Sequence, residues 1–317
     1  MIKQIEVLNK ALLGALVGLA LLTPAVIIAA PLKVVTSFSI LNDLVQQVGG
    51  DKVEAVTIVG PESDAHSFEP RPSDAKSLQD ADLLIINGVQ FEAWLPKLTQ
   101  AAGYVGEIIE ASDGVPLRAY EAEDAHGHEA ADDHEHQGHE HGVFDPHAWQ
   151  SLEHAQLYVH NICDAFVRID PENKLYYQQR TAEYEKSMRK LHAELLAKFE
   201  KLPAHKRSVV SSHDAFSYLG QAYGINFLSL LGASNQAEPS AKELADLITY
   251  MRTNQVQAVF VENISSPKLI EQIARETDAV VGRHLYSDAL AKSPHPADTY
   301  LGMMQWNAEA LLEALNH

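Results

Sequence analysis

Apolar residues recur with two alternating periods along the first half of the chain. The β-branched runs at residues 32–38 and 53–59 have the composition of buried strands, while the segment 39–49 between them has helical spacing and ends in Gly-Gly. The same criteria predict further strands at residues 82–86 and 105–109. They predict further helices at residues 72–79, 91–101 and about 152–168. Strands that alternate with helices predict a parallel sheet covered on both faces.

The segment 171–202 has a different character, because it contains no glycine and no internal proline. Apolar side chains recur among its charges at helical spacing: Leu175, Tyr176, Met188, Leu191, Leu195 and Phe199. This pattern predicts one helix of about thirty residues, or ~45 Å at 1.5 Å per residue. Such a helix suits a strut between two domains, and a helix packed along a single large domain is the alternative.

After this helix the alternation begins again. Strands are expected at residues 207–211, 225–231, 257–261 and 279–281, and helices at residues 215–223, 240–253, 268–276 and 298–315, the last docking on the second sheet. The fold class is therefore α/β, with two lobes that each hold a parallel sheet flanked by helices, joined by one long rigid helix. We expect the lobes at residues 31–170 and 203–317, with 171–202 as the linker helix.

Residues 1–30 have the features of an export signal. Lys3 and Lys10 precede the apolar run 12–28, and the small residues Ala29 and Ala30 follow it. The alternative is a retained membrane anchor, because the apolar run is borderline for spanning. No cysteine lies near the predicted cleavage point, so a free periplasmic protein is expected, without a lipid anchor or stable membrane insertion.

Composition narrows the range of partners. A formal net charge of -19 argues against nucleic acid and anionic membrane surfaces, and favours cations. The single cysteine, Cys163, excludes an intrachain disulfide and a cysteine-based zinc site, and its apolar surroundings favour packing. A monomer is expected.

One segment, residues 120–142, is dense in histidines and acids. Its histidines are His126, His128, His134, His136, His139 and His141. Such a segment has too few large apolar residues to form a core, so a mobile loop that binds metal weakly is expected. A solvated polar insertion without a role is the alternative.

Four residues outside that segment follow predicted strands. His66 and His147 follow strands of the first half, His213 follows the strand ending at residue 211, and Asp288 follows residues 279–281. Ligands of open α/β sheets bind beyond the carboxyl ends of the strands, so these side chains are expected to meet in a cleft between the lobes. Three imidazoles and one carboxylate suit tetrahedral zinc, whereas manganese prefers more oxygen.

Each of these residues also has a simpler interpretation as an exposed polar residue or a cap. His284 is a rival fourth ligand, although it lies closer to the end of its strand. Asp145, which precedes Pro146, is expected to form a turn rather than to bind metal.

The sequence motifs around the four residues resemble those of a known protein family. The motifs are D-A-H-S-F-E-P-R-P-S-D at His66, D-P-H-A-W at His147, S-S-H-D-A-F-S-Y-L at His213, and L-Y-S-D-A-L at Asp288, followed by A-D-T-Y-L. In order and spacing these motifs resemble the periplasmic zinc or manganese solute-binding proteins of ABC importers, over nearly the whole mature chain.

The resemblance implies that the four residues ligate the metal, that two lobes are joined by one long rigid helix, and that the ion passes to a membrane permease with its cytoplasmic ATPase. Histidine at position 213 and the His-rich loop resemble zinc members, whereas many manganese members have glutamate at that position. Some zinc members differ by a disulfide in the second lobe, or by an acid where this chain has Ala65.

The predicted function is thus the periplasmic solute-binding component of a zinc ABC import system, with Zn²⁺ as the transported ligand. A manganese- or iron-binding member of the same family is the first alternative. A zinc-dependent hydrolase is a less favoured class, because the chain has no H-E-x-x-H motif and a saturated site leaves no position for water. The third alternative is a metal-dependent adhesin or a metal buffer that works without an importer.

Overall fold

The computed structural model describes residues 30–120, 143–232 and 239–316. The predicted signal peptide, apart from its last residue, and the six histidines of the insertion lie outside these ranges. Among the described residues, no helix has both the length and the apolar character needed to cross a membrane.

The first half of residues 31–317 is built on a four-stranded sheet. Its strands are β1 (Leu32–Phe38), β2 (Val53–Val59), β3 (Leu83–Ile86) and β4 (Glu107–Glu110), parallel throughout and in the order β2-β1-β3-β4. The helices of this half are α2 (Ser39–Gly49), α3 (Pro72–Gln79), α4 (Leu95–Ala102) and α5 (His154–Ile169). β1 and β3 are the inner strands, and most of their side chains are buried.

The second half repeats this arrangement. Its strands are β5 (Ser208–His213), β6 (Asn226–Leu231), β7 (Ala258–Val259) and β8 (Val280–Val281), parallel and in the order β6-β5-β7-β8. Its helices are α7 (Ser217–Tyr223), α8 (Ala241–Asn254), α9 (Lys268–Thr277) and α10 (Tyr300–Leu315). The same relative strand order in both sheets confirms the predicted repeat.

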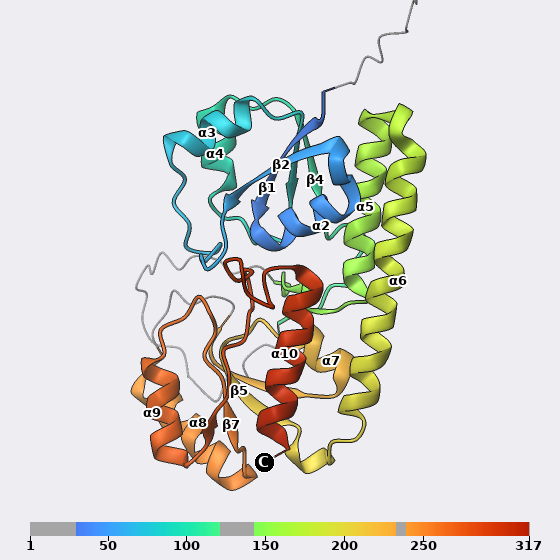
Figure 1. Ribbon diagram of the computed structural model, residues 1–317. Helices are drawn as coiled ribbons and strands as arrows, with labels where there is room; N and C mark the ends of the chain where they lie inside the picture. Colours follow the sequence, from blue (N-terminus) through green and yellow to red (C-terminus); the bar gives the residue numbers. More distant parts are fainter. Residues whose placement is uncertain (1–29, 121–142, 233–238, 317) are drawn as a thin grey trace, which may run out of the picture. The chain divides into compact units, whose positions relative to one another are not determined.

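Helix α6 (Lys174–Phe199) runs alongside both halves (Figure 1). One narrow stripe of it is buried, made of Tyr177, Thr181, Glu185, Met188, Leu195 and Phe199. In its first part Arg180 donates to the carbonyl of Gln47 in α2, and near its end the ring of Phe199 stacks on Tyr223 of α7. The long helix predicted from the sequence is confirmed, and it packs against both halves.

Several boundaries differ from the predicted ones. Helix α4 begins at Leu95 instead of residue 91, because Gly88, Val89 and Gln90 all have positive φ and form a turn ahead of it. The long helix begins at Lys174, after a 3₁₀ turn at Pro171–Asn173. Strands β7 and β8 have only two residues each, so the second sheet is shorter at this edge than expected.

The two faces of the second sheet belong to different apolar clusters. Val210 and Val259 pack with the buried side chains of α8 and α9, whereas Val209 and Ala258 share a cluster with α10. Alternation of side chains along parallel strands produces this division. Docking of the last helix beside the second sheet was predicted.

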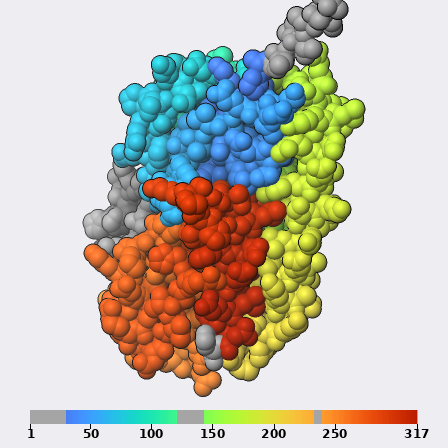
Figure 2. All heavy atoms as spheres, in the orientation of Figure 1, coloured from blue at the N-terminus to red at the C-terminus, as the bar shows by residue number. Residues whose placement is uncertain are grey.

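Helix α10 also reaches the first half, which was not predicted. Its first residue, Tyr300, donates its backbone N–H to Asp43 of α2. In the space-filling view the C-terminal segment, in red, lies directly against the first half, in blue (Figure 2). The two halves are thus connected by α10 as well as by α6.

Because α6 contains no glycine or proline and packs on both halves, we predict that zinc binding changes the separation of the halves little. Small-angle scattering of the protein with and without zinc is expected to give nearly equal radii of gyration. Ser187→Gly with Lys190→Gly, at two exposed positions near the middle of α6, is the matched control that loosens the helix by about 1 kcal/mol per residue. A clear expansion of the wild-type protein on zinc removal would contradict the prediction.

Candidate metal centre

The carboxyl ends of the strands in both sheets face one region, and the four predicted residues lie there. His66 lies in the loop between β2 and α3, and His147 directly precedes the 3₁₀ turn Ala148–Gln150. His213 is the last residue of β5, instead of following the strand as predicted, and Asp288 lies between β8 and α10. One ligand atom from each of the four lies within 4.8 Å of the others.

The three histidines present the same nitrogen. Nε2 of His66 and Nε2 of His147 are 3.2 Å apart. Nε2 of His66 and of His213 lie 3.4 and 3.2 Å from Oδ2 of Asp288, and Nε2 of His147 lies 3.5 Å from Oδ1. Ligand atoms ~2.0–2.1 Å from a tetrahedral zinc ion are about 3.3 Å from one another. These four separations are close to that value, and the whole group lies within 4.8 Å.

Three of the four side chains at the centre are fully buried. The side chains of His147, His213 and Asp288 are 0% exposed, whereas that of His66 is 11% exposed. The ring of Phe91 packs on His66 with centroids 4.6 Å apart, and Trp149 packs on His147 at 5.2 Å. A charge in these buried surroundings interacts with its neighbours more strongly than it does in water.

The pKa shifts of Asp288, His66 and His213 show how charge is distributed at the centre. Burial raises the pKa of Asp288, but the neighbouring His213 and His147 outweigh it and hold that pKa well below its usual range. Burial lowers the pKa of His66, which favours its neutral, metal-binding form. Burial also opposes charge on His213, yet Glu262 and Asp288 raise its pKa well above the usual value.

Neither carboxylate oxygen of Asp288 has a hydrogen-bond partner within the described parts of the chain. A buried carboxylate without hydrogen bonds is costly unless a cation or another charge compensates it. The three imidazole nitrogens around Asp288 could complete the ligands of such a cation. The donor set and its geometry are those of a metal centre.

The loop that carries Asp288 is contacted by residues of the first half. Trp149 Nε1 and Gln150 Nε2 donate to the carbonyl of Ser287 at 2.9 and 2.7 Å. On the other side, the backbone N–H of Leu290 donates to Ser39 Oγ at 3.0 Å. Asp288 thus belongs to the second half by sequence but is held beside His147 by residues that follow His147 directly.

Two buried carboxylates, Asp145 and Glu262, contact the histidines from behind. Asp145 accepts the backbone N–H of His147, which is the predicted turn, and its Oδ1 also lies 2.7 Å from Nδ1 of the ring. Burial raises the pKa of Asp145, but His147 and Ser217 lower it more. Glu262 was missed by the sequence analysis, and the detectable signal was an acid at the carboxyl end of a strand.

His284, the rival fourth ligand, is not part of the group. Its side chain is exposed, and its carbonyl accepts a hydrogen bond from Trp306 Nε1.

A second buried network supports the loop before His147. Asn87 donates from Nδ2 to the carbonyl of Pro146 at 3.0 Å, and its backbone N–H donates to Glu92 at 2.6 Å. Glu92 also accepts from Ser37 Oγ and from the N–H of Gly88. Burial nevertheless raises the pKa of Glu92 to about 7.

The raised pKa of Glu92 predicts a pH-dependent stability. Its folded pKa exceeds the value of 4.5 for an unperturbed glutamate, so its contribution is fully present below about pH 4.5 and is lost as pH rises through 7. The loss amounts to about 3 kcal/mol at 1.36 kcal/mol per pKa unit. Urea unfolding of the zinc-free protein is expected to show this loss in the wild type and not in Glu92→Gln, so parallel stability–pH curves would contradict it.

Comparison with known protein families matches residues 34–314 to ZnuA, described as zinc-uptake complex component A, periplasmic. The chain belongs to the ZnuA family. Members are metal-binding substrate-binding proteins of ABC transporters, which are not enzymes and which work with a membrane permease and an ATPase. The resemblance seen in the motifs is confirmed, and the hydrolase alternative is excluded.

Similar proteins carry names with different metals. The manganese ABC transporter substrate-binding lipoprotein PsaA of Streptococcus pneumoniae is 32% identical over 90% of this chain and 89% of its own length. The iron ABC transporter substrate-binding lipoprotein MtsA of Streptococcus pyogenes serotype M1 is 29% identical, with the same two coverages. The structure of the periplasmic zinc-binding protein TroA of Treponema pallidum has a TM-score of 0.79 and 25% identity, covering 90% of this chain and 99% of that one.

Proposed function

We propose that this ZnuA-family protein captures Zn²⁺ through His66, His147, His213 and Asp288 and delivers it to its permease in a zinc import system. The observation that carries the proposal is the convergence of three imidazole Nε2 atoms on one buried carboxylate. Nitrogen-rich, four-coordinate sites suit zinc, whereas manganese favours carboxylate, carbonyl and water oxygen.

Manganese is the second candidate, because one feature besides the name of PsaA favours it. Both oxygens of Asp288 face the histidines, with Oδ1 3.5 Å from His147 and Oδ2 3.2 Å from His213. A carboxylate that binds through both oxygens gives a five-coordinate site with two oxygen ligands. The donor set remains richer in nitrogen than manganese prefers, so zinc is favoured.

Metal analysis of the protein purified from its own compartment tests the choice. We expect about one zinc ion per chain, and we expect zinc to displace manganese in a competition titration, as the order of divalent-metal affinities requires. Manganese as the principal metal of the protein purified from its own compartment would establish the second candidate instead.

Location and organisation form part of the same proposal. We place the protein in the periplasm after removal of residues 1–30, as a free monomer with lobes at residues 31–170 and 203–317 and a linker at 171–202. PsaA and MtsA are named as lipoproteins, whereas the only cysteine of this sequence, Cys163, lies in α5. Mass spectrometry of the mature N-terminus tests this difference.

The insertion is assigned a separate, weaker role. With residues 121–142 deleted, we predict that zinc titration loses a weak class of binding and keeps one tight ion, because the four proposed ligands lie elsewhere. Ordering a loop costs roughly 1–2 kcal/mol per residue, which lowers the affinity of its histidines. If a folded deletion variant lost the tight ion, one of the six loop histidines would be a primary ligand.

A further inference from the structure

Two of the proposed ligand histidines, one from each half, each have a carboxylate against both the backbone N–H and Nδ1 of the ring. Asp145 accepts the backbone N–H of His147 at 2.9 Å and lies 2.7 Å from Nδ1 of its ring. Glu262 accepts the backbone N–H of His213 at 2.9 Å, and its second oxygen lies 2.5 Å from Nδ1. The arrangement recurs although Asp145 lies two residues from its histidine and Glu262 lies 49 residues from its own.

Both carboxylates are buried, each with 1% of the residue exposed. A buried carboxylate is costly, and apolar residues of similar volume often stabilise a protein as well or better. Two such residues placed directly behind two metal-ligand candidates therefore point to a role in the metal centre rather than in the core.

The chemistry of imidazole supplies that role. A carboxylate at Nδ1 holds the ring proton on that nitrogen, which leaves the lone pair of Nε2 directed at the metal and makes it a stronger donor. Nε2 is the atom that both His147 and His213 direct toward Asp288. A stronger nitrogen donor benefits zinc more than manganese, which binds nitrogen less strongly.

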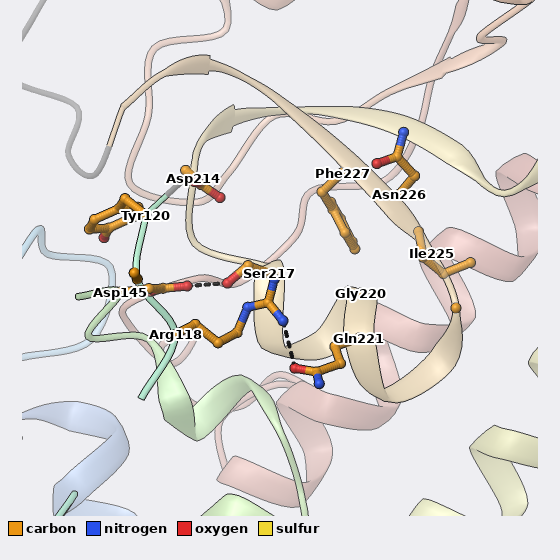
Figure 3. A pocket seen from close by; sticks show the side chains of 12 residues that line it. Arg118, Tyr120, Asp145, Asp214, Ser217, Gly220, Gln221, Ile225, Asn226 and Phe227 are labelled. Carbon is orange, nitrogen blue, oxygen red and sulfur yellow. Dashed lines mark hydrogen bonds between the residues drawn. The ribbon is translucent and has the colours of Figure 1, made fainter. Parts of the chain in front are cut away.

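Asp145 is also held from the second half. Its Oδ2 accepts a hydrogen bond from Ser217 Oγ, and its backbone carbonyl accepts one from the hydroxyl of Tyr218 at 3.0 Å. Figure 3 shows the carboxylate of Asp145 directed at Ser217 of α7, in a pocket lined on one side by Arg118 and Tyr120. The orientation of His147 thus depends on a contact between the two halves.

We propose that Asp145 and Glu262 are positioning residues that raise the preference of the centre for zinc over manganese, with Ser217 securing Asp145 from the second half. The inference rests on the proposed function, because it presumes that His147 and His213 bind the metal. It assigns to the two carboxylates a contribution to selectivity beyond that of the four ligands.

The test is a pair of dissociation constants, for zinc by chelator competition and for manganese by titration, on the full chain and its variants. Asp145→Asn and Glu262→Gln are each expected to weaken zinc binding about 10–100-fold. Manganese binding is expected to weaken less, so the ratio of the two constants shifts toward manganese. The absorption spectrum of bound Co²⁺ is expected to change as the imidazole is reoriented.

Asp64→Asn is the matched control. Asp64 also lies two residues before a ligand candidate and accepts the backbone N–H of His66 at 2.8 Å, in a more exposed position. This variant is expected to keep the wild-type ratio. Ser217→Ala changes neither carboxylate nor any proposed ligand. It is expected to shift the ratio of the two dissociation constants in the same direction as Asp145→Asn, but by less. It therefore tests the proposal even if the Asp145→Asn protein does not fold.

Three results separate the possibilities. A lower zinc-to-manganese preference in the carboxylate and Ser217 variants, with Asp64→Asn unchanged, supports the proposal. Equal losses for both metals, or unchanged constants and Co²⁺ spectra in the folded variants, would overturn it and leave the proposed function intact. A wild-type protein that fails to bind zinc tightly would refute the proposed function itself.

Discussion

Replacing Asp288 by alanine is expected to lower zinc affinity by about two to three orders of magnitude. Apparent binding free energies of structural zinc sites are ~10–16 kcal/mol, or about 2.5–4 kcal/mol for each of four ligands. At ~1.4 kcal/mol per factor of ten, losing one ligand costs roughly a hundredfold to a thousandfold. The loss falls at the upper end because Asp288 is the only anion among the four and is fully buried.

Competition with a chromogenic chelator measures this change. Asp288→Asn keeps the shape of the side chain and one oxygen donor but removes the charge. Its zinc affinity is expected to lie between those of the wild type and Asp288→Ala. Asp246→Ala, at an exposed position in α8, is the control and should leave the constant unchanged. Wild-type affinity in a folded Asp288→Ala protein would show that another group supplies the fourth ligand.

Zinc binding is expected to release a proton at neutral pH, and zinc affinity is expected to rise with pH. In the zinc-free protein, burial opposes charge on His213, but Glu262 and Asp288 raise its pKa well above 6.5, so the ring keeps its proton to a higher pH than an ordinary histidine does. Zinc must displace the proton from Nε2. Affinity should therefore rise about tenfold per pH unit until pH exceeds the pKa of His213.

The slope should steepen in acid. Burial lowers the pKa of His66 below 6.5, so His66 adds a second displaced proton only at pH values below that lowered pKa. Calorimetry in buffers of different ionisation enthalpy counts the protons directly, and we expect about one at pH 7. Glu262→Gln removes the largest influence that raises the pKa of His213 and should reduce that count. Proton-free binding at pH 7 by the wild type would refute a charged His213.

The sequence predicted the fold well because both halves show strong periodic patterns. The ranges 32–38, 39–49, 53–59 and 72–79 match the observed elements to the residue. The errors arise where backbone conformation overrides the apolar pattern, as in the turn at Val89 and Gln90 ahead of α4. The contact of α10 with α2 has no local signal, since it joins Tyr300 to Asp43.

The sequence predicted the four candidate ligands of the site but not the carboxylate of Glu262 beside them. His66, His147 and Asp288 lie in segments that follow strands, and His213 ends one, so the rule that ligands bind beyond the carboxyl ends of parallel strands brings them together. Their ligation of a metal stays a prediction. Glu262 was missed because its contact with His213 requires β7 to lie beside β5, and strand order is a property of the folded sheet.

Anomalous diffraction at the zinc absorption edge, from a crystal of the full chain loaded with one equivalent of zinc, tests the central claim most directly. The account predicts one strong peak about 2.0–2.1 Å from Nε2 of His66, His147 and His213 and from a carboxylate oxygen of Asp288. A principal peak bound by other residues, with these four side chains free of metal, would contradict it.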